Sequence, residues 1–274
     1  MNKKSDKIVV YTSIYGYKDL LMKQPKYPNV DYICFTDCKD FKSKTWRIII
    51  KNGFSSNPKL NAKMFKILPH MFLSSYKYSI WIDGNVTCRQ NPGLLIDRYL
   101  KTHNIAMFKH GRIVNGKGCI YEEASACIEF GLDDPDIIAR QISRYKEQGY
   151  PELNGLAVCR IIMRKHNEPE IIEAMKNWWY EILDYSKRDQ ISFNYIMHKH
   201  NLRYEEIERN TLEEYFHTEK HLWTLPSENF GKITAQLVHF FIKIVQRYPC
   251  LLFFLENYLS ARRRYLRLKN YFSR

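Results

Sequence analysis

The sequence lacks the cysteine pairs, the hydrophobic leader and the long apolar run that would place a chain outside the cytoplasm or across a membrane. Its seven cysteines are scattered without a CxxC pair, and the spacing of Cys34 and Cys38 alone is a weak zinc signal. The first residues, Met-Asn-Lys-Lys-Ser-Asp-Lys, contain no apolar stretch. The apolar segments 237–245 and 251–259 are each much shorter than the roughly 20 residues that span a bilayer. We therefore expect a reduced, cytoplasmic chain.

Two glycine-rich signatures are also missing. Neither a dinucleotide-binding fingerprint nor a Walker loop follows the first two apolar runs, 7–16 and 31–37, which argues against a Rossmann oxidoreductase and a P-loop kinase. Acidic residues are few, because 29 Asp and Glu face 43 Lys and Arg, a net charge of +14. This charge predicts attraction to nucleic acid, an anionic membrane or phosphorylated small molecules, and does not choose among them. Half of the excess lies in residues 233–274, where eight Lys or Arg face one Glu.

The stretch 78–87 is the clearest structural signal that is present. Its β-branched and aromatic residues stop at Asp83-Gly84-Asn85, and the run is apolar on both faces, which is typical of a central strand in a covered sheet. In open α/β sheets, ligands lie beyond the carboxyl ends of such strands. We expect Asp83 at that edge, where its carboxylate suits a hard cation that carries phosphate oxygens. Asp-Gly between two strands is also a hairpin signal, and spacing alone leaves that alternative open.

The remaining apolar patterns alternate between strands and helices, which favours a layered α/β domain. Strands are predicted at 7–16, 31–37, 46–50 and 105–108, and a loop followed by a strand within 153–163. Helices are predicted at 57–68, 91–100, 136–148, 168–185, 186–197 and from 119 onward. The helix at 57–68 carries Lys59, Lys63 and Lys66 on or near one face. This face is either solvated or directs Lys59 or Lys63 at a diphosphate near Asp83.

Several other charged residues have both a structural and a chemical interpretation. Glu122 and Glu123 fall in the first turns of a helix, where acidic side chains are favourable without any chemistry. Asp189 could be a plain helix cap. His217 and His221 are four residues apart, so they could bind a metal from one helical face or be ordinary surface and packing residues.

Four motifs occur in order along the chain: Ile80-Trp-Ile-Asp-Gly-Asn85, His110-x-Arg112 followed by Cys119-Ile-Tyr-Glu-Glu-Ala124, Leu153-x-Gly-Leu156, and Arg188-Asp-Gln-x-Ser-Phe193. Together they resemble the glycosyltransferase-like family that includes plant mucilage and pollen-turgor proteins and bacterial members of surface-polysaccharide loci. The resemblance covers residues 7–223. It implies a GT-A fold, in which a Rossmann-like, mixed and mostly parallel sheet is covered by helices. We expect this catalytic domain at 1–232, followed by a basic, apolar helical tail at 233–274.

The resemblance also implies a site for a nucleotide sugar and for Mn²⁺ or Mg²⁺. Asp83 and Asn85 would stand where the family's Asp-x-Asp metal motif stands, with Asn85 replacing the second Asp and removing one negative charge. His217 or His221 resembles the late histidine that completes such metal sites. Asp189 would contact the donor sugar or act at the reaction centre, and Glu122 and Glu123 are further candidate bases. The donor-binding candidates are Thr12, Tyr15, Gly16, Asp37, Lys59, Lys63, His110, Arg112, Gly155 and Gln190.

These expectations describe a hexosyltransferase that moves a sugar from a nucleoside-diphosphate donor to a glycan or lipid-linked acceptor in cell-surface polysaccharide synthesis. Residues 233–274 suit an anionic interface at the inner face of the membrane, and no nucleic-acid partner is expected. The tail could equally be a packed appendix or a dimer contact. Two alternatives stay open for the whole chain: a non-catalytic basic module for anionic lipid or nucleic acid on a GT-A-like scaffold, and a sugar nucleotidyltransferase.

Overall fold

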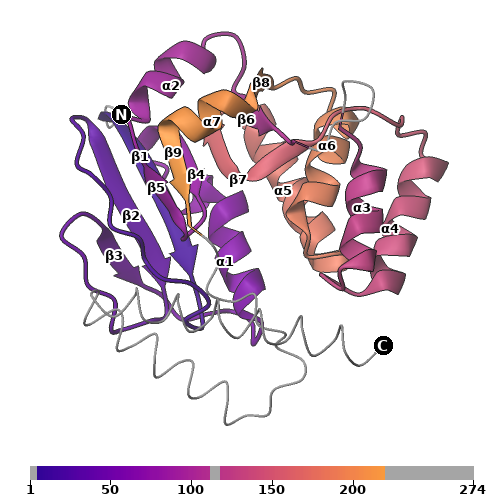
Figure 1. The fold of residues 1–274 in the computed structure, drawn as a ribbon, viewed down its shortest axis with the longest axis horizontal. Coiled ribbons are helices and arrows are strands. Elements are labelled where there is room, and N and C mark those ends of the chain that lie inside the picture. The colour runs from indigo at the N-terminus through magenta and orange to yellow at the C-terminus, as the bar shows by residue number, and fades with distance from the viewer. Residues whose placement is uncertain (1–4, 112–117, 220–274) are drawn as a thin grey trace, which may run out of the picture.

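The computed structural model describes residues 5–111 and 118–219. Arg112, His221, the boundary at 232 and the tail at 233–274 lie outside these residues. The described chain forms a seven-stranded sheet in the order β3-β2-β1-β4-β7-β6-β8 and a two-stranded sheet of β5 and β9 (Figure 1). The strands are β1 Ser5–Ile14, β2 Val30–Thr36, β3 Arg47–Ile50, β4 Tyr76–Ile82, β5 Val86–Cys88, β6 Ile105–Lys109, β7 Ala157–Arg164, β8 Glu205–Ile207 and β9 Phe216–Thr218.

The large sheet is mixed and mostly parallel, as predicted. Strand β1 pairs in parallel with β2 and with β4, β2 pairs in parallel with β3, and β6 pairs in parallel with β8. Strand β7 is antiparallel to both of its neighbours, β4 and β6. The carboxyl ends of β1, β4 and β6 and the amino end of β7 therefore meet at one edge of the sheet.

Helices cover both faces of the sheet. They are α1 Pro58–Ile67, α2 Gly93–Tyr99, α3 Ile120–Glu129, α4 Pro135–Glu147, α5 Pro169–Asp184, α6 Asp189–Lys199 and α7 Arg209–Tyr215, with a short 3₁₀ turn at Pro69–Met71. Residues of α1 and α3 to α6 pack in one core, whereas residues of α2 and α7 pack in a second core on the opposite face. In Figure 1, α3 to α6 stand together at the right and α2 and α7 lie above the sheet.

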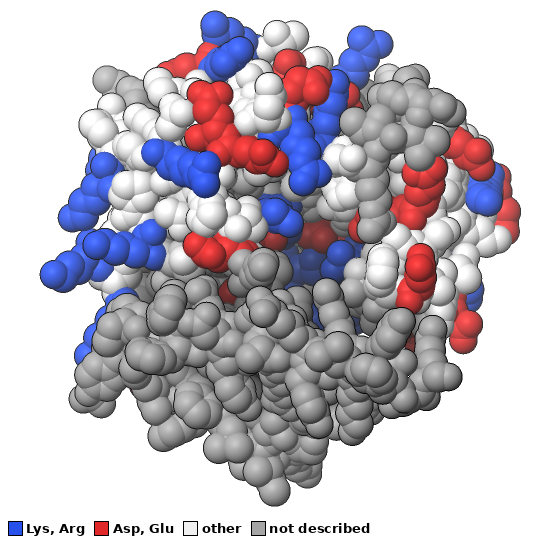
Figure 2. All heavy atoms as spheres, viewed as in Figure 1, with Lys and Arg blue, Asp and Glu red and all other residues white. Residues whose placement is uncertain are grey.

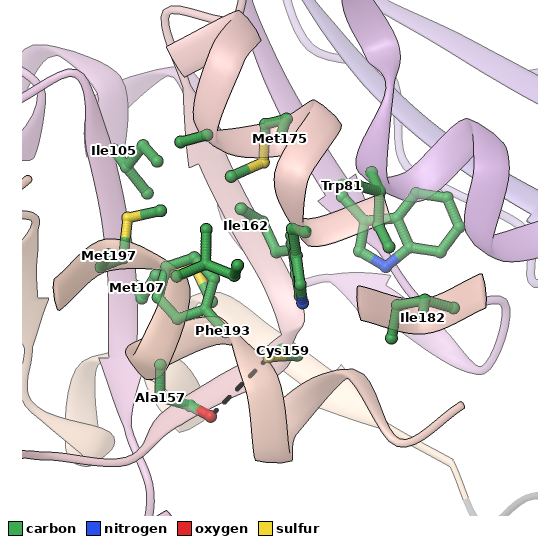
Figure 3. Packing of buried hydrophobic residues seen from close by; sticks show 14 of the residues in the cluster. Trp81, Ile105, Met107, Ala157, Cys159, Ile162, Met175, Ile182, Phe193 and Met197 are labelled. Carbon is green, nitrogen blue, oxygen red and sulfur yellow. Dashed lines mark hydrogen bonds between the residues drawn. The ribbon is translucent and has the colours of Figure 1, made fainter. Parts of the chain in front are cut away.

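Alternation along the central strands explains the two cores. Val9 and Tyr11 belong to the first core and Val10 to the second, because successive side chains of a strand point to opposite faces. In the same way Trp81 joins the first core and Ile80 the second. Figure 3 shows Trp81 in the first core with residues of β7 and α5. The prediction that strand 78–82 is buried on both faces is confirmed.

The hairpin alternative for Asp83-Gly84 is wrong, because the strands on its two sides belong to different sheets. Strand β4 pairs with β1 and β7, whereas β5 pairs with β9. The backbone N–H of Val86 donates to the carbonyl of Asp83 at 3.0 Å, so the chain turns sharply as it leaves the large sheet. Asp83 is thereby placed at the carboxyl end of a central strand.

The six described cysteines are buried and unpaired. Among the residues that the structure describes, no helix combines the length and the apolar character needed to cross a membrane.

Candidate functional site

A cleft of about 640 Å³ lies at the sheet edge where β1, β4 and β6 end and β7 begins. Tyr15 follows β1 and Asp83 follows β4, and the parallel pairing of these strands brings both residues to the cleft. Because β7 runs the opposite way, its first residues contribute Cys159 and Arg160 to the same lining. The start of α1 and the start of α6 complete the walls.

Positive charge dominates the cleft. Its described lining contains eight Lys or Arg and four Asp side chains. In Figure 2, blue side chains lie in and above a recess at the middle of the molecule, with red ones among them. Such a lining attracts anions, and phosphate groups above all. The basic residues are Lys18, Lys59, Lys63, Lys66, Arg160, Lys187, Arg188 and Arg209, and the acidic ones are Asp19, Asp83, Asp133 and Asp189.

A chain of four charged side chains lies in this cleft. Asp189 Oδ2 is 2.9 Å from Lys63 Nζ and 2.6 Å from Lys66 Nζ, and Lys66 Nζ is 3.4 Å from Asp83 Oδ1. The side chains of Lys63, Lys66 and Asp189 are 17%, 6% and 11% exposed, so they are largely withdrawn from water. The alternative of a solvated lysine face on α1 is therefore wrong for Lys63 and Lys66.

Local structure fixes the lysines. The side chain of Asn57 caps α1 by accepting from Lys59 N at 2.9 Å, and the three-residue spacing puts Lys63 and Lys66 on one face. At the end of the helix, the carbonyl of Lys66 accepts from the buried guanidinium of Arg164 at 2.6 Å and from Tyr11 Oη at 3.0 Å. The first turn of α1 is thus capped locally, and its last turn is tied to β1 and β7.

Asp83 is held from two directions. Its Oδ1 accepts from the indole N–H of Trp81 at 2.8 Å, and its backbone N–H donates to the carbonyl of Arg160 at 3.0 Å. The Trp81 ring also lies under the ammonium of Lys66, 5.4 Å from the ring centroid to Nζ. One carboxylate oxygen of Asp83 is therefore oriented by a buried side chain before any ligand arrives.

The shared ion pairs affect the three groups differently. Burial alone would raise the pKa of Asp189, but the ammonium groups of Lys63 and Lys66 outweigh it and hold that pKa well below its ordinary range. Burial acts to lower the pKa of Lys66, but Asp189 and Asp83 outweigh it and raise that pKa above its ordinary value. Burial lowers the pKa of Lys63; the carboxylate of Asp189 acts to raise it, but it does not outweigh burial together with the repulsion from Lys66. Lys66 is thus the more firmly charged of the two.

The structure brings seven of the predicted site residues to the cleft and places the other described ones elsewhere. The seven are Tyr15, Lys59, Lys63, Asp83, His110, Asp189 and Gln190. Thr12 is fully buried, and Gly16 N donates to the exposed Asp37 carboxylate at 2.9 Å beside the end of β1. Gly155 has a φ of +86° and faces Asn194. These four do not line the cleft, and their assignment to donor binding stays a prediction.

The two candidate glutamates of α3 differ from each other. Glu123 is buried, with Oε1 lying 3.9 Å from the guanidinium of Arg188 and accepting from Cys127 Sγ at 3.6 Å. Glu122 is partly exposed, and neither glutamate lines the cleft. Asp189 is therefore the one of the three candidate bases that the described structure places in the cleft.

The cation that the resemblance implies needs several oxygen or nitrogen ligands around Asp83. Within residues 5–111 and 118–219, no three His, Cys, Asp or Glu side chains converge as such a site requires. Asn85 donates from Nδ2 to the carbonyl of Glu219 at 2.6 Å. Its buried Oδ1 has no partner among these residues, but Asn85 does not line the cleft.

His217 does not complete a metal site in the described chain. It lies on β9 and not on a helix, with Nε2 2.8 Å from Glu219 Oε1 and Nδ1 2.9 Å from Arg89. The donor atoms that the structure describes therefore do not fit a resident Mn²⁺ or Mg²⁺. His221 lies outside the described residues, so its place in a metal site stays a prediction.

Several basic residues of the cleft were not predicted from the sequence as donor-binding residues. Lys66 had a usable signal, since it lies one helical turn from Lys63 on the same face. Arg160 sits inside the apolar strand β7, and its carbonyl accepts from the backbone N–H of Asp83, which is distant in sequence. The other unselected residues, Lys18, Lys187, Arg188 and Arg209, come from loops and helix starts whose approach to the cleft depends on the tertiary fold.

The fold and the cleft define an α/β protein with a basic, anion-attracting site at the carboxyl ends of its parallel strands. The family model of the TOD1/MUCI70 glycosyltransferase-like domain matches residues 34–220, and the chain belongs to this family. A relative from Arabidopsis thaliana described as probable hexosyltransferase MUCI70 is 26% identical over 165 residues, which cover 56% of this chain and 28% of the relative. A second, described as alkaline ceramidase TOD1, is 26% identical over 172 residues, which cover 57% of this chain and 36% of that protein. The chain thus spans well under half of the length of either relative.

Proposed function

We propose that this protein is a hexosyltransferase that takes a sugar from a nucleoside-diphosphate donor and passes it to a glycan or lipid-linked acceptor of a cell-surface polysaccharide. The observation that carries the proposal is the cluster of Lys63, Lys66, Asp189 and Asp83 in a basic cleft, in which Lys66 and Asp189 are buried. Membership of a glycosyltransferase-like family supports the reaction class. The cleft is also within the range of roughly 300 to 1,000 Å³ that small-molecule sites occupy.

The proposed donor pose follows from the placement of charge. The diphosphate lies against Lys63 and Lys66, because ammonium groups in a water-poor site stabilise the charge that develops on the leaving group. The nucleoside lies toward the end of β1, where Tyr15 lines the cleft. Asp189 then lies toward the donor sugar and the acceptor hydroxyl. Residues 233–274 would hold the enzyme at the anionic inner face of the membrane.

A thermal-shift panel tests the donor. The full chain is heated with UDP-glucose, UDP-galactose, UDP-N-acetylglucosamine or GDP-mannose, each with Mn²⁺, with Mg²⁺ or with EDTA. At least one nucleotide sugar should raise the melting temperature, because a ligand that binds only the folded state stabilises it. The shift should shrink in Lys66→Met, which removes an ammonium group placed against the diphosphate, while the far-UV circular dichroism stays native. A flat response to every donor under all three conditions contradicts the proposal.

Product analysis separates this proposal from its enzymatic rivals. A transferase releases a nucleoside diphosphate, whereas a sugar nucleotidyltransferase releases or consumes pyrophosphate. The name of the second relative suggests a third assay, release of fatty acid from ceramide. The basic lining of the cleft favours a phosphate-bearing donor over the two apolar chains of a ceramide. Release of fatty acid without nucleotide turnover would therefore overturn the transferase assignment.

Deleting residues 233–274 separates a transferase from a binding module. A transferase keeps donor cleavage and activity on a soluble acceptor without this segment, since the candidate catalytic and phosphate-binding residues Asp189, Lys63 and Lys66 lie outside it. A basic module that works by binding anionic lipid or nucleic acid loses its partner instead. The measurements are nucleoside diphosphate release and cosedimentation with vesicles containing phosphatidylserine.

A further inference from the structure

We propose that Lys66, supported by Lys63, supplies the positive charge that stabilises the leaving diphosphate, so that donor cleavage in this protein needs no divalent cation. The inference rests on the proposed transferase function and names the groups that serve it. Two ammonium groups carry the same formal charge as one Mn²⁺ or Mg²⁺. In this cleft the ammonium of Lys66 lies 3.4 Å from Oδ1 of Asp83, the residue to which the family resemblance assigns the metal, and the ammonium of Lys63 lies on the far side of Asp189 from that carboxylate.

The two ammonium groups and the two carboxylates of the cluster balance in formal charge, so the excess positive charge that attracts an anion comes from the rest of the described lining. Asp189 is shared by both ammonium groups, at 2.9 and 2.6 Å, and Asp83 reaches only Lys66, at 3.4 Å. The surrounding lining adds six further Lys or Arg side chains against two further Asp side chains. A diphosphate that enters can therefore replace part of the contact with Asp189 and gain charge-assisted hydrogen bonds.

The same geometry is unfavourable for a divalent cation on Asp83. A cation bound to Oδ1 would displace or compete with the indole N–H of Trp81, which donates to that oxygen at 2.8 Å. It would also lie close to the ammonium of Lys66, and two positive charges in a largely buried site repel strongly. Asn85, which would offer its Oδ1 as the second ligand, does not line the cleft. A lysine ammonium group, unlike a divalent cation, is positively charged without any coordinating side chains.

The assigned step balances without a metal. The acceptor hydroxyl oxygen forms a bond to the anomeric carbon of the donor, and the bond from that carbon to the β-phosphate oxygen breaks. The electron pair of the broken bond stays on the nucleoside diphosphate, where Lys66 and Lys63 stabilise the added charge. The hydroxyl proton passes to the carboxylate of Asp189, whose lysine partners have turned to the phosphates.

A structural ion pair is the competing explanation, and anion binding tells the two apart. Inorganic pyrophosphate is titrated by calorimetry into the wild-type chain, Lys66→Met and Asp189→Asn, all in EDTA. Wild type should bind, and Lys66→Met should lose at least about tenfold in affinity. Asp189→Asn should bind about tenfold more tightly, since its lysines have lost their carboxylate. Unchanged affinity in both variants would overturn the inference.

Activity provides the second readout. Nucleoside diphosphate release is measured in EDTA and in Mn²⁺ for wild type, Lys66→Met, Lys66→Arg and the control Lys176→Met, which changes an exposed lysine of α5 outside the cleft. Wild type should turn over equally in EDTA and in Mn²⁺. Lys66→Met should lose about a hundredfold in kcat in both conditions, Lys66→Arg should recover part of it, and Lys176→Met should match wild type.

The two hypotheses fail in different ways. Turnover that vanishes in EDTA and returns with Mn²⁺ overturns the lysine assignment and leaves the transferase function standing. Absence of turnover in both conditions overturns the proposed function, and the lysine assignment with it. If Lys66→Met does not fold, the pyrophosphate titration of Asp189→Asn decides, because its expected change is a gain.

Discussion

The buried ammonium of Lys66 lies 2.6 Å from the carboxylate of Asp189 and thereby joins α1 to the first residue of α6 across the cleft. The two helices are far apart in the chain, yet their charged side chains meet at the sheet edge. Because both groups are largely withdrawn from water, the contact is stronger than an exposed ion pair and more costly to break on one side. The stability of the domain and the chemistry of the cleft therefore depend on the same atoms.

Asp189→Asn should destabilise the protein by about 3 kcal/mol at neutral pH, because it leaves two buried ammonium groups without their shared carboxylate. The depressed pKa of Asp189 fixes the pH dependence. Its stabilising effect is complete above the unfolded-state pKa of about 3.9 and is lost as the pH falls through the lower folded-state pKa. Urea unfolding should therefore show a smaller difference between variant and wild type at about pH 3 than at about pH 7. Equal differences at both pH values would contradict this account.

Regular apolar patterns made most of the architecture predictable. The runs that became β1, β2 and β4 and the amphipathic helix α5 were readable because their apolar spacing extends over several residues. The short elements β8, α7 and β9 were not predicted. Strands of three residues carry too little periodicity, and their pairing with β6 and β5 depends on segments distant in sequence.

The candidate site could be predicted from the sequence only in part, because tertiary contacts determine which charged side chains meet. Asp83 was identified because the end of a buried strand fixes its position. Asp189 had the local pattern of a helix cap, and nothing local shows that its carboxylate meets Lys63 and Lys66. Glu122 and Glu123 are neighbours in sequence, yet one is partly exposed and the other is buried near Arg188. Burial of an individual charge is set by the tertiary fold.

Glu181→Ala should destabilise the domain by about 3 kcal/mol and leave donor binding unchanged. Buried Glu181 accepts from Tyr145 Oη at 2.9 Å and from Gln141 Nε2 at 3.2 Å, and it forms an ion pair with Arg144. The variant leaves these donors without their acceptor, but none of the four residues lines the cleft. Urea unfolding measures the stability, and the melting-temperature shift with the active nucleotide sugar measures binding. If the folded variant shows no melting-temperature shift with the nucleotide sugar, the hydrogen bonds of Glu181 are needed for donor binding, which contradicts the prediction.

Gly118→Ala should destabilise the protein by about 2 kcal/mol or more, because a side chain has no room there. A Cβ atom on Gly118 would lie 2.4 Å from Leu156 Cβ and 2.9 Å from the backbone nitrogen of Leu156. The contact joins the segment before α3 to the segment before β7, which carry two of the motifs found in the sequence. Gly149→Ala is the control, since a Cβ there meets nothing within 4 Å. Its destabilisation comes from the positive φ of this residue alone. Urea midpoints should therefore fall further for Gly118→Ala than for Gly149→Ala.

Trp81→Phe should weaken donor binding severalfold while costing only about 1 kcal/mol of stability. Phenylalanine keeps most of the buried packing against Tyr11, whose ring centroid lies 5.3 Å from that of Trp81, but it cannot donate to Asp83 Oδ1. Asp83 then loses the hydrogen bond that orients it, and the ring under Lys66 becomes a weaker partner for the ammonium. Trp46→Phe is the matched control, because the indole of buried Trp46 donates to the carbonyl of Met22 at 2.7 Å outside the cleft. Calorimetric titration with the active nucleotide sugar should show a higher Kd for Trp81→Phe and an unchanged Kd for Trp46→Phe, whereas equal effects would mean that the indole of Trp81 contributes to packing alone.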